Sequence, residues 1–168
     1  VMRDAHIVTM DLKSVRAAEV GAKQKYSPNG FNGKEICAIT RYAGISNKVS
    51  SFGIYEYQYS PKDTITAMLV AQMIWYFVEG FKERKGDYPV ASKSKYKKYH
   101  VAMETEEHEL IFYKSDFSGR WWMEVPFPSD LKSKFIRHQM VPCSYADYEL
   151  ALSGEVPDRW FQTFEKLA

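Results

Sequence analysis

The stretch Ile7-Val8-Thr9-Met10-Asp11-Leu12-Lys13 begins with an apolar run and passes into an aspartate. Such a run predicts a β-strand over residues 7–10. In open α/β sheets, ligands and metals bind outside the carboxyl ends of the strands, so Asp11 is a candidate site residue. An Asp-x-Asp ending would place two carboxylates on one face of the strand, where they could bridge divalent metals. Here Lys13 occupies the second position.

Outward from this stretch, the pattern predicts two successive β-loop-α units. The first strand leads through a loop rich in Gly, Pro and Asn to a helix near 34–42, with Gly44 available to close it. A second strand over 49–57 contains Glu56, and the following turn supplies a cap for a long helix over 64–85.

The alternation of strands and helices implies parallel pairing of the two strands. Right-handed crossover connections would then bring Asp11 and Glu56 to the same edge of the sheet, where both could face one cleft.

Four segments of the first half resemble a known family. They are residues 8–16, the loop Ser27-Pro28-Asn29-Gly30-Phe31, the helix 33–44 and the segment 52–57. Together they resemble the carboxyl-terminal part of the ureohydrolase superfamily, which contains arginase, agmatinase and formimidoylglutamase. The likeness is closest to divergent arginase-like or formimidoylglutamase-like proteins. It covers residues 6–81 and continues more loosely to the C-terminus.

This resemblance implies an α/β fold. We expect part of an arginase-like three-layer fold with a mainly parallel sheet, carrying an antiparallel hairpin appendage and C-terminal helices. The expected parts are an α/β core over 1–85, a lysine-rich insertion over 86–98, antiparallel strands over 99–126 and a helical extension over 127–168.

The resemblance also assigns roles to site residues. Asp11 matches a ligand of the dinuclear manganese (Mn²⁺) centre, and Glu56 matches the acidic residue that binds the guanidinium or amidine end of the substrate. A carboxylate suits that task because it accepts two parallel hydrogen bonds from a planar cationic fork. Lys13 stands in place of a second aspartate ligand. A protonated ammonium cannot donate a lone pair, and its charge opposes a cation at that position.

The family's other metal motifs come earlier in the chain than the Asp11 segment, and only ten residues precede Asp11 here. Asp4-Ala5-His6 imitates part of one motif, but Val8 stands where the third carboxylate belongs, so we interpret it as a chance match. The resemblance therefore implies a piece of a longer protein or a parent that has lost its catalytic half.

Composition indicates a folded, cytoplasmic protein. The chain has 168 residues, 45% of them apolar, and a formal charge of +2, which argues against a strong whole-protein field for nucleic acid. Cys37 and Cys143 lack metal-site spacing and indicate free thiols in a reducing compartment. No signal-peptide pattern opens the chain. The longest apolar stretch, 65–78, is shorter than the roughly 20 residues that span a bilayer. We expect a buried helix there and no membrane partner.

The lysine-rich insertion has two interpretations. Basic residues interleaved with aromatic ones can follow a phosphate backbone and stack bases, which would favour nucleic-acid binding. A solvated loop explains the composition more simply, so nucleic acid is the less favoured partner. The residues concerned are Lys93, Lys95, Tyr96, Lys97, Lys98 and Tyr99.

In the second half, Trp121 and Trp122 are adjacent in an expected strand and should point to opposite faces. We expect core or interface packing for them. A helix near 158–167 carries an apolar stripe that fits a docking helix, either on its own domain or on a partner chain. His100, His108 and His138 are interpreted as surface or structural residues.

Two functions follow. One is a ureohydrolase-like hydrolase of guanidine or amidine C–N bonds, metal-impaired or inactive as this chain. The other is a non-catalytic ureohydrolase-like scaffold or assembly protein. Both suit a homo-oligomer. We predict that the chain binds Mn²⁺ weakly or not at all and hydrolyses neither arginine, agmatine nor formimidoylglutamate.

Overall fold

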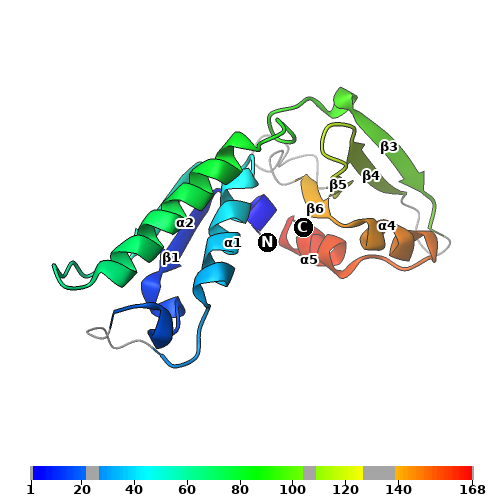
Figure 1. The fold of residues 1–168 in the computed structure, drawn as a ribbon. Helices are drawn as coiled ribbons and strands as arrows, with labels where there is room; N and C mark the ends of the chain where they lie inside the picture. The colour runs from blue at the N-terminus through cyan, green and yellow to red at the C-terminus, as the bar shows by residue number, and fades with distance from the viewer. Residues whose placement is uncertain (1, 22–26, 104–108, 127–138, 168) are drawn as a thin grey trace. The chain divides into compact units, whose positions relative to one another are not determined.

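The computed structural model describes residues 2–21, 27–103, 109–126 and 139–167 (Figure 1). The chain forms two compact units, Val1–Arg84 (unit 1) and Lys85–Ala168 (unit 2). The architecture is mixed α/β, with a parallel sheet in unit 1 and an antiparallel sheet in unit 2. Residues 104–108 of the expected antiparallel strands, which include His108, lie outside the described residues, as do residues 127–138 of the expected helical extension, which include His138.

The described part of unit 1 contains two parallel strands and two α-helices. Strand β1 (Ile7–Asp11) pairs with β2 (Ser51–Tyr55), and Asp11 lies opposite Tyr55. Helices α1 (Gly33–Ile45) and α2 (Thr64–Lys82) follow the two strands. Three short 3₁₀ turns lie at Met2–Asp4, Leu12–Ser14 and Ala17–Glu19. The predicted β-loop-α units and their parallel pairing are confirmed, but the second strand ends at Tyr55, before Glu56, and the second helix ends at Lys82 rather than 85.

Helices α1 and α2 cross with their backbones in close approach. A Cβ at Gly44 would lie 2.2 Å from the carbonyl oxygen of Phe77, and one at Gly80 would lie 2.3 Å from that of Arg41. Only glycine fits two such positions. The expectation that Gly44 closes α1 is wrong, because the helix continues to Ile45 and buries Gly44 against α2.

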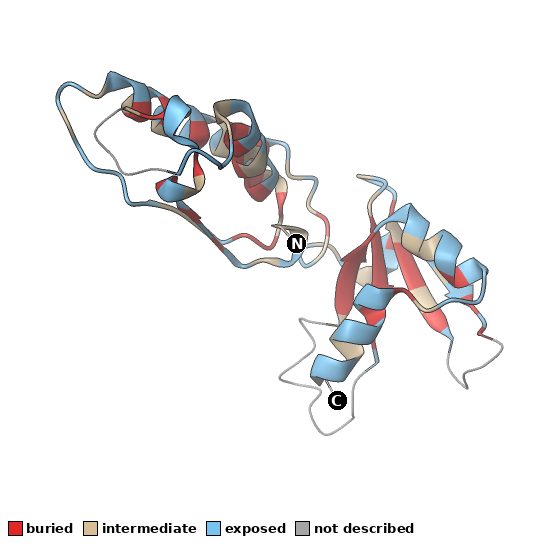
Figure 2. Cartoon of the chain, turned by 90° about the horizontal axis from the view of Figure 1, so that it is seen from below, coloured by how far each residue is buried: buried red, intermediate tan, exposed pale blue. Residues whose placement is uncertain are grey.

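The core of unit 1 lies between the sheet and these helices. Val8 and Met10 point into it from alternate positions of β1, and Ile36 and Met73 meet them from the two helices. Figure 2 shows buried and exposed residues alternating around α1 and α2.

Helix α2 is not the buried helix that the sequence predicts. Only 22% of its 18-residue apolar window is buried, and its outer side is apolar as well as its inner side. By length and composition alone α2 could cross a membrane, a criterion that is weak for one helix.

Unit 2 contains a four-stranded antiparallel sheet in the order β3-β4-β5-β6. The strands are β3 (Tyr96–Val101), β4 (Leu110–Ser115), β5 (Trp121–Glu124) and β6 (Met140–Cys143). Helices α4 (Tyr145–Leu152) and α5 (Asp158–Leu167) complete the unit, with a 3₁₀ turn at Lys93–Lys95.

The core of unit 2 is made by the sheet and its C-terminal helices. Phe112 and Met123 are fully buried, and Trp160 of α5 packs with them. The Trp160 indole Nε1–H also donates to the Glu124 carbonyl oxygen at 3.0 Å. Helix α5 thus docks, through Trp160, on its own unit. Trp121 and Trp122 belong to different clusters, which confirms that they point to opposite faces.

Two sequence expectations for unit 2 need correction. Strand β3 begins at Tyr96 rather than Tyr99, and Asp87 is fully buried, so residues 86–98 are not simply a solvated insertion. The expected helical extension contains strand β6, so the antiparallel part is a sheet with its own core rather than a hairpin appendage. The sheet's edge strands carry exposed Lys97 and Lys98 on β3 and Pro142, which has no N–H, on β6.

Candidate functional site

The carboxyl edge of the parallel pair holds the three residues singled out by the sequence. Asp11 is the last residue of β1, and Glu56 directly follows β2. Because the strands are parallel and Asp11 pairs with Tyr55, the two acids lie at the same edge of the sheet. This placement confirms the predicted shared edge, while the cleft that both acids could face stays a prediction.

The Asp11 carboxylate is used by the turn that follows β1. The Asp11 side-chain Oδ1 accepts a hydrogen bond of 2.7 Å from the Lys13 backbone N–H. The Asp11 backbone carbonyl oxygen accepts a second one, also of 2.7 Å, from the Ser14 hydroxyl. Asp11 is thus the N-cap of the Leu12–Ser14 turn. Leu12 is fully buried, which anchors this turn to the core.

Lys13 turns its side chain to Glu56. Its Nζ lies 2.8 Å from Glu56 Oε2, and the two side chains are 58% and 44% exposed. Sequence reasoning placed Lys13 as an obstacle to metal but missed this pairing, since spacing alone does not fix where a flexible four-carbon stem points. At this exposure an isolated ion pair contributes only about 0.2–1 kcal/mol.

Glu56 also has an unusual backbone. Its φ is +63°, and within the described residues it is the one residue other than glycine with positive φ. A glutamate held in this left-handed region costs on the order of 1–3 kcal/mol, and such residues cluster at ligand-binding sites. The conformation sets the direction in which Glu56 leaves the end of β2.

The donors at this edge do not fit a dinuclear manganese centre. Such a centre needs several carboxylate or imidazole ligands, and no group of three or more His, Cys, Asp or Glu side chains that could hold a metal occurs in the described residues. Asp11 is engaged with a backbone N–H, and Lys13 brings an ammonium to the second ligand position.

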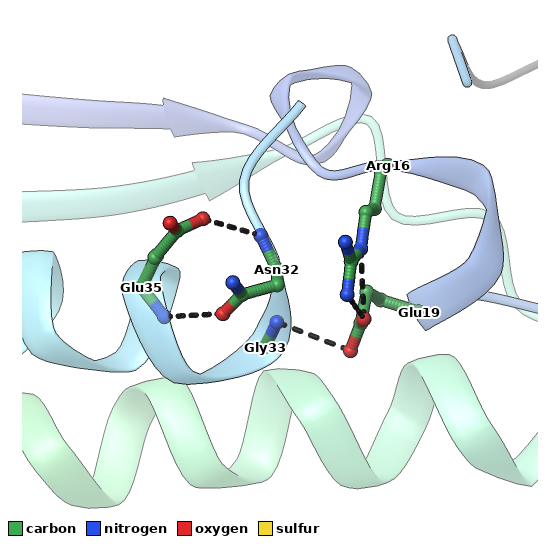
Figure 3. A network of polar contacts seen from close by, with 5 residues as sticks. All are labelled: Arg16, Glu19, Asn32, Gly33 and Glu35. Carbon is green, nitrogen blue, oxygen red and sulfur yellow. Dashed lines mark hydrogen bonds and ion pairs between the residues drawn. The ribbon is translucent and has the colours of Figure 1, made fainter. Parts of the chain in front are cut away.

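A second polar network fixes the loop beside this edge. Arg16 Nε and Nη2 donate to Glu19 Oε1 at 2.9 and 2.6 Å, and Glu19 Oε2 accepts the Gly33 N–H at 3.1 Å (Figure 3). The Arg16 hydrogen bonds, followed by that from Gly33, lower the pKa of the Glu19 carboxyl. Asn32 and Glu35 form a reciprocal capping box at the same helix end.

The Ser27–Phe31 loop that carries the family resemblance is tied to the same segment. The Phe31 N–H donates to the Ser14 carbonyl oxygen at 2.8 Å, and the Arg16 N–H donates to the Phe31 carbonyl oxygen at 3.1 Å. A Cβ at Gly30 would lie 2.5 Å from the Ser14 carbonyl oxygen, so glycine is required there. The loop therefore supports the turn that carries Asp11 and Lys13.

Other candidates have structural partners. Asp4 forms an ion pair with the buried Lys48. Of the lysine-rich segment, Lys93 pairs with Glu124 and Lys97 pairs with Asp116.

His100 lies at the surface, 49% exposed, with its Nδ1 2.7 Å from Glu109 Oε2.

Unit 2 contains a polar cluster that sequence reasoning missed. Glu124 Oε2 accepts the Tyr113 hydroxyl at 2.5 Å, and Oε1 accepts Lys93 Nζ at 2.7 Å and the Gln139 amide. Burial raises the pKa of Glu124, but the Lys93 and Tyr113 hydrogen bonds outweigh it, so the net shift is downward. Because the cluster joins a turn to two strands and is satisfied internally, we interpret it as structural.

A shallow cavity of about 400 Å³, largely open to solvent, begins just after Glu56 along the chain. The loop residues Tyr57, Tyr59 and Pro61 form one wall, and Met68 and Ala71 of α2 form another. Asp11, Lys13 and Glu56 do not line it.

Comparison of the chain with models of protein families, with curated proteins and with solved structures gave no match. Inference about function therefore depends on the geometry of the Asp11–Lys13–Glu56 edge and on the resemblance described above.

Proposed function

We propose that unit 1 is a ureohydrolase-like α/β unit in which Glu56 recognises guanidinium or amidine cations, and that the chain by itself binds such cations without hydrolysing them. The observation that carries the proposal is the 2.8 Å contact between Lys13 Nζ and Glu56 Oε2. It supports a Glu56 carboxylate directed at a cation, at the edge where α/β sheets bind ligands.

In this proposal Lys13 is an internal competitor. Its ammonium occupies Glu56 as a point charge, whereas a guanidinium or amidine would bind the same carboxylate through two parallel N–H donors. An exposed ion pair of about 0.2–1 kcal/mol is weak enough for such a cation to displace Lys13. In this proposal the unit keeps the carboxylate that binds the substrate cation. It lacks the ligands of a dinuclear metal centre, because Asp11 is the one carboxylate at the metal-ligand positions.

The test is a calorimetric titration of the full chain with agmatine and with guanidinium. Lys13→Met removes the competitor and keeps the apolar stem, so affinity should rise by up to about fivefold, the equivalent of about 1 kcal/mol. Glu56→Gln should abolish binding. Lys62→Met, which removes another exposed lysine of unit 1, is the matched control and should change nothing.

Two results would overturn the proposal. Equal affinity in wild type, Lys13→Met and Glu56→Gln would remove Glu56 as the recognition residue and favour the scaffold function. Manganese-dependent release of urea or formamide, or a stoichiometric Mn²⁺ site tighter than about micromolar, roughly −8 kcal/mol, would show that the chain is a competent hydrolase.

A further inference from the structure

The outer side of α2 carries a largely exposed apolar surface, at one end of which the Arg84 guanidinium lies 4.2 Å from the centre of the Phe81 ring. We call it the α2 stripe, and its large members are each between 46% and 62% exposed: Ile65, Met68, Ile74, Trp75, Val78 and Phe81. Aromatic side chains bury 150–250 Å² each, so Trp75 at 60% exposure alone offers on the order of 100 Å². A standard interface buries about 800 Å² per partner, so the exposed Tyr57 and Tyr59 beside the stripe must contribute to it as well.

The centre of the α2 stripe has the spacing of a helix–helix seam. Met68, Ala71, Trp75 and Val78 follow one another at intervals of three, four and three residues, which is the a/d pattern of paired helices. Polar residues end the seam on both sides, with Thr64 before it and Lys82 after it. The spacing is symmetric about position 73, so an antiparallel copy of the same helix would place Met68 against Val78 and Ala71 against Trp75.

The pairing of Ala71 with Trp75 is complementary in size as well as in position. Beside Ala71 and Met68 lies the 400 Å³ cavity, walled on the other side by Tyr57, Tyr59 and Pro61. A large side chain opposite Ala71 would enter this cavity, and the residue that the symmetry places there is Trp75 of the other copy. A two-fold interface requires one surface that is complementary to itself, and a projecting tryptophan beside an open depression meets that requirement.

We propose that two copies of this chain associate through antiparallel packing of their α2 helices, with Trp75 of each copy seated in the cavity beside Ala71 of the other. The proposal is independent of the function proposed for Glu56, since the Asp11–Lys13–Glu56 edge does not line that cavity. A buried tryptophan at the centre of a small interface is the expected energetic anchor.

Sedimentation equilibrium of the full chain should give a mass twice 19.5 kDa at micromolar concentrations. Trp75→Ala should weaken association by at least about 30-fold, as expected for a central tryptophan. Tyr42→Ala is the matched control, because Tyr42 is a similarly exposed aromatic residue on α1, away from the stripe, and its removal should leave the mass unchanged.

A charge exchange tests the register. Met68→Glu and Val78→Lys should each yield monomers, because each places a charge against an apolar partner. The double variant should dimerise again, because each introduced carboxylate then faces an introduced ammonium of the other copy, and these ion pairs should weaken at high salt. Recovery in the double variant also excludes misfolding as the cause of the single-variant losses.

Cross-linking tests the antiparallel orientation. A mixture of Thr64→Cys and Lys82→Cys chains should link efficiently with a short bis-maleimide, and neither variant should link alone. The native Cys37 and Cys143 are buried, so wild-type chain serves as the blank.

Three outcomes would overturn the proposal. One is a monomeric chain throughout the micromolar range. Another is a dimer whose mass does not respond to Trp75→Ala or to the charge variants. The third is flotation of a monomer with phosphatidylcholine vesicles that Trp75→Ala abolishes, which would assign the stripe to a lipid surface instead.

Discussion

Units 1 and 2 differ in how completely their helices and sheet enclose apolar side chains. In unit 2, four antiparallel strands with α4 and α5 enclose a core in which Phe112 and Met123 are fully buried. In unit 1, two parallel strands and two helices bury Ile36 and Met73 but leave one whole side of α2 apolar and exposed. Parallel sheets occur with both faces covered, whereas antiparallel sheets tolerate one solvated face. The comparison teaches that unit 1 leaves apolar helix surface exposed, which is the surface on which the proposed dimer depends, whereas the core of unit 2 is enclosed by its own helices.

The largest effect should come from opening the core of unit 2. Phe112→Ala should lower the free energy of unfolding of unit 2 by about 3–5 kcal/mol, because it removes a fully buried ring. Hydrogen exchange measured by mass spectrometry should show faster exchange in residues 85–168 and little change before them. Phe117→Ala, at a ring 59% exposed, is the control. Equal loss of protection in both units would break the two-unit comparison.

A smaller effect, confined to unit 1, should come from the helix crossing. Gly44→Ala forces a methyl group to within 2.2 Å of the Phe77 carbonyl oxygen, so the helices must separate at a cost of about 3 kcal/mol. The loss in unfolding free energy can be measured by urea titration, with hydrogen exchange in residues 2–84 as the readout. Gln72→Ala, at an exposed position of the same unit, should be nearly neutral. A neutral Gly44→Ala would mean that α1 and α2 can slide apart freely.

The polar cluster of unit 2 should make its stability depend on pH. The pKa of Glu124 is lowered below 4.5 in the folded chain, so this group stabilises the fold fully above the unfolded value and loses that contribution as pH falls through the folded pKa. Glu124→Gln should cost about 2 kcal/mol at neutral pH. The gap between the variant and wild type should narrow below pH 4.5. Urea titrations at several pH values measure the gap, with Glu155→Gln, an exposed glutamate, as the control. A difference in unfolding free energy that stays constant with pH would show that the lowered pKa of Glu124 does not stabilise unit 2.

The smallest effect should come from the cap of α1. Asn32→Ala removes the acceptor of the Glu35 N–H and should cost about 1 kcal/mol. Thermal unfolding would detect the change, and Asn32→Asp should restore most of it. Because the capping box lies beside the Arg16–Glu19 network, loss of protection should be greatest in residues 14–21 and 27–35. A loss that spreads evenly over unit 1 would show that the cap does not stabilise this loop locally.

Much of unit 1 could be predicted from the sequence. The apolar run ending at Asp11 and the strand ending near Glu56 have clear periodicity, and a helix between two strands nearly requires parallel pairing. These two rules place both acids at one edge. They do not place side chains, which is why the Lys13–Glu56 contact and the left-handed backbone of Glu56 were not foreseen.

The misses in unit 2 have physical causes. Lys97 and Lys98 suggested a solvated loop, but lysine is common on edge strands, where its charge faces water. Strand β6 carries Pro142, which argues against a central strand and is tolerated at an edge. For α2, the apolar content of the sequence predicted a buried helix. Composition alone cannot distinguish a helix that its own chain encloses from one with an exposed apolar side.

The edges of the unit 2 sheet have one further consequence. Lys97 and Lys98 on one border and Pro142 on the other discourage a passing strand from docking, and such features keep β-proteins from polymerising. Crowded, freshly synthesised copies of the chain should therefore not stack through unit 2 into fibres. Replacing Pro142 by valine would restore an amide donor to that border and should shorten the lag time before thioflavin-positive aggregates form.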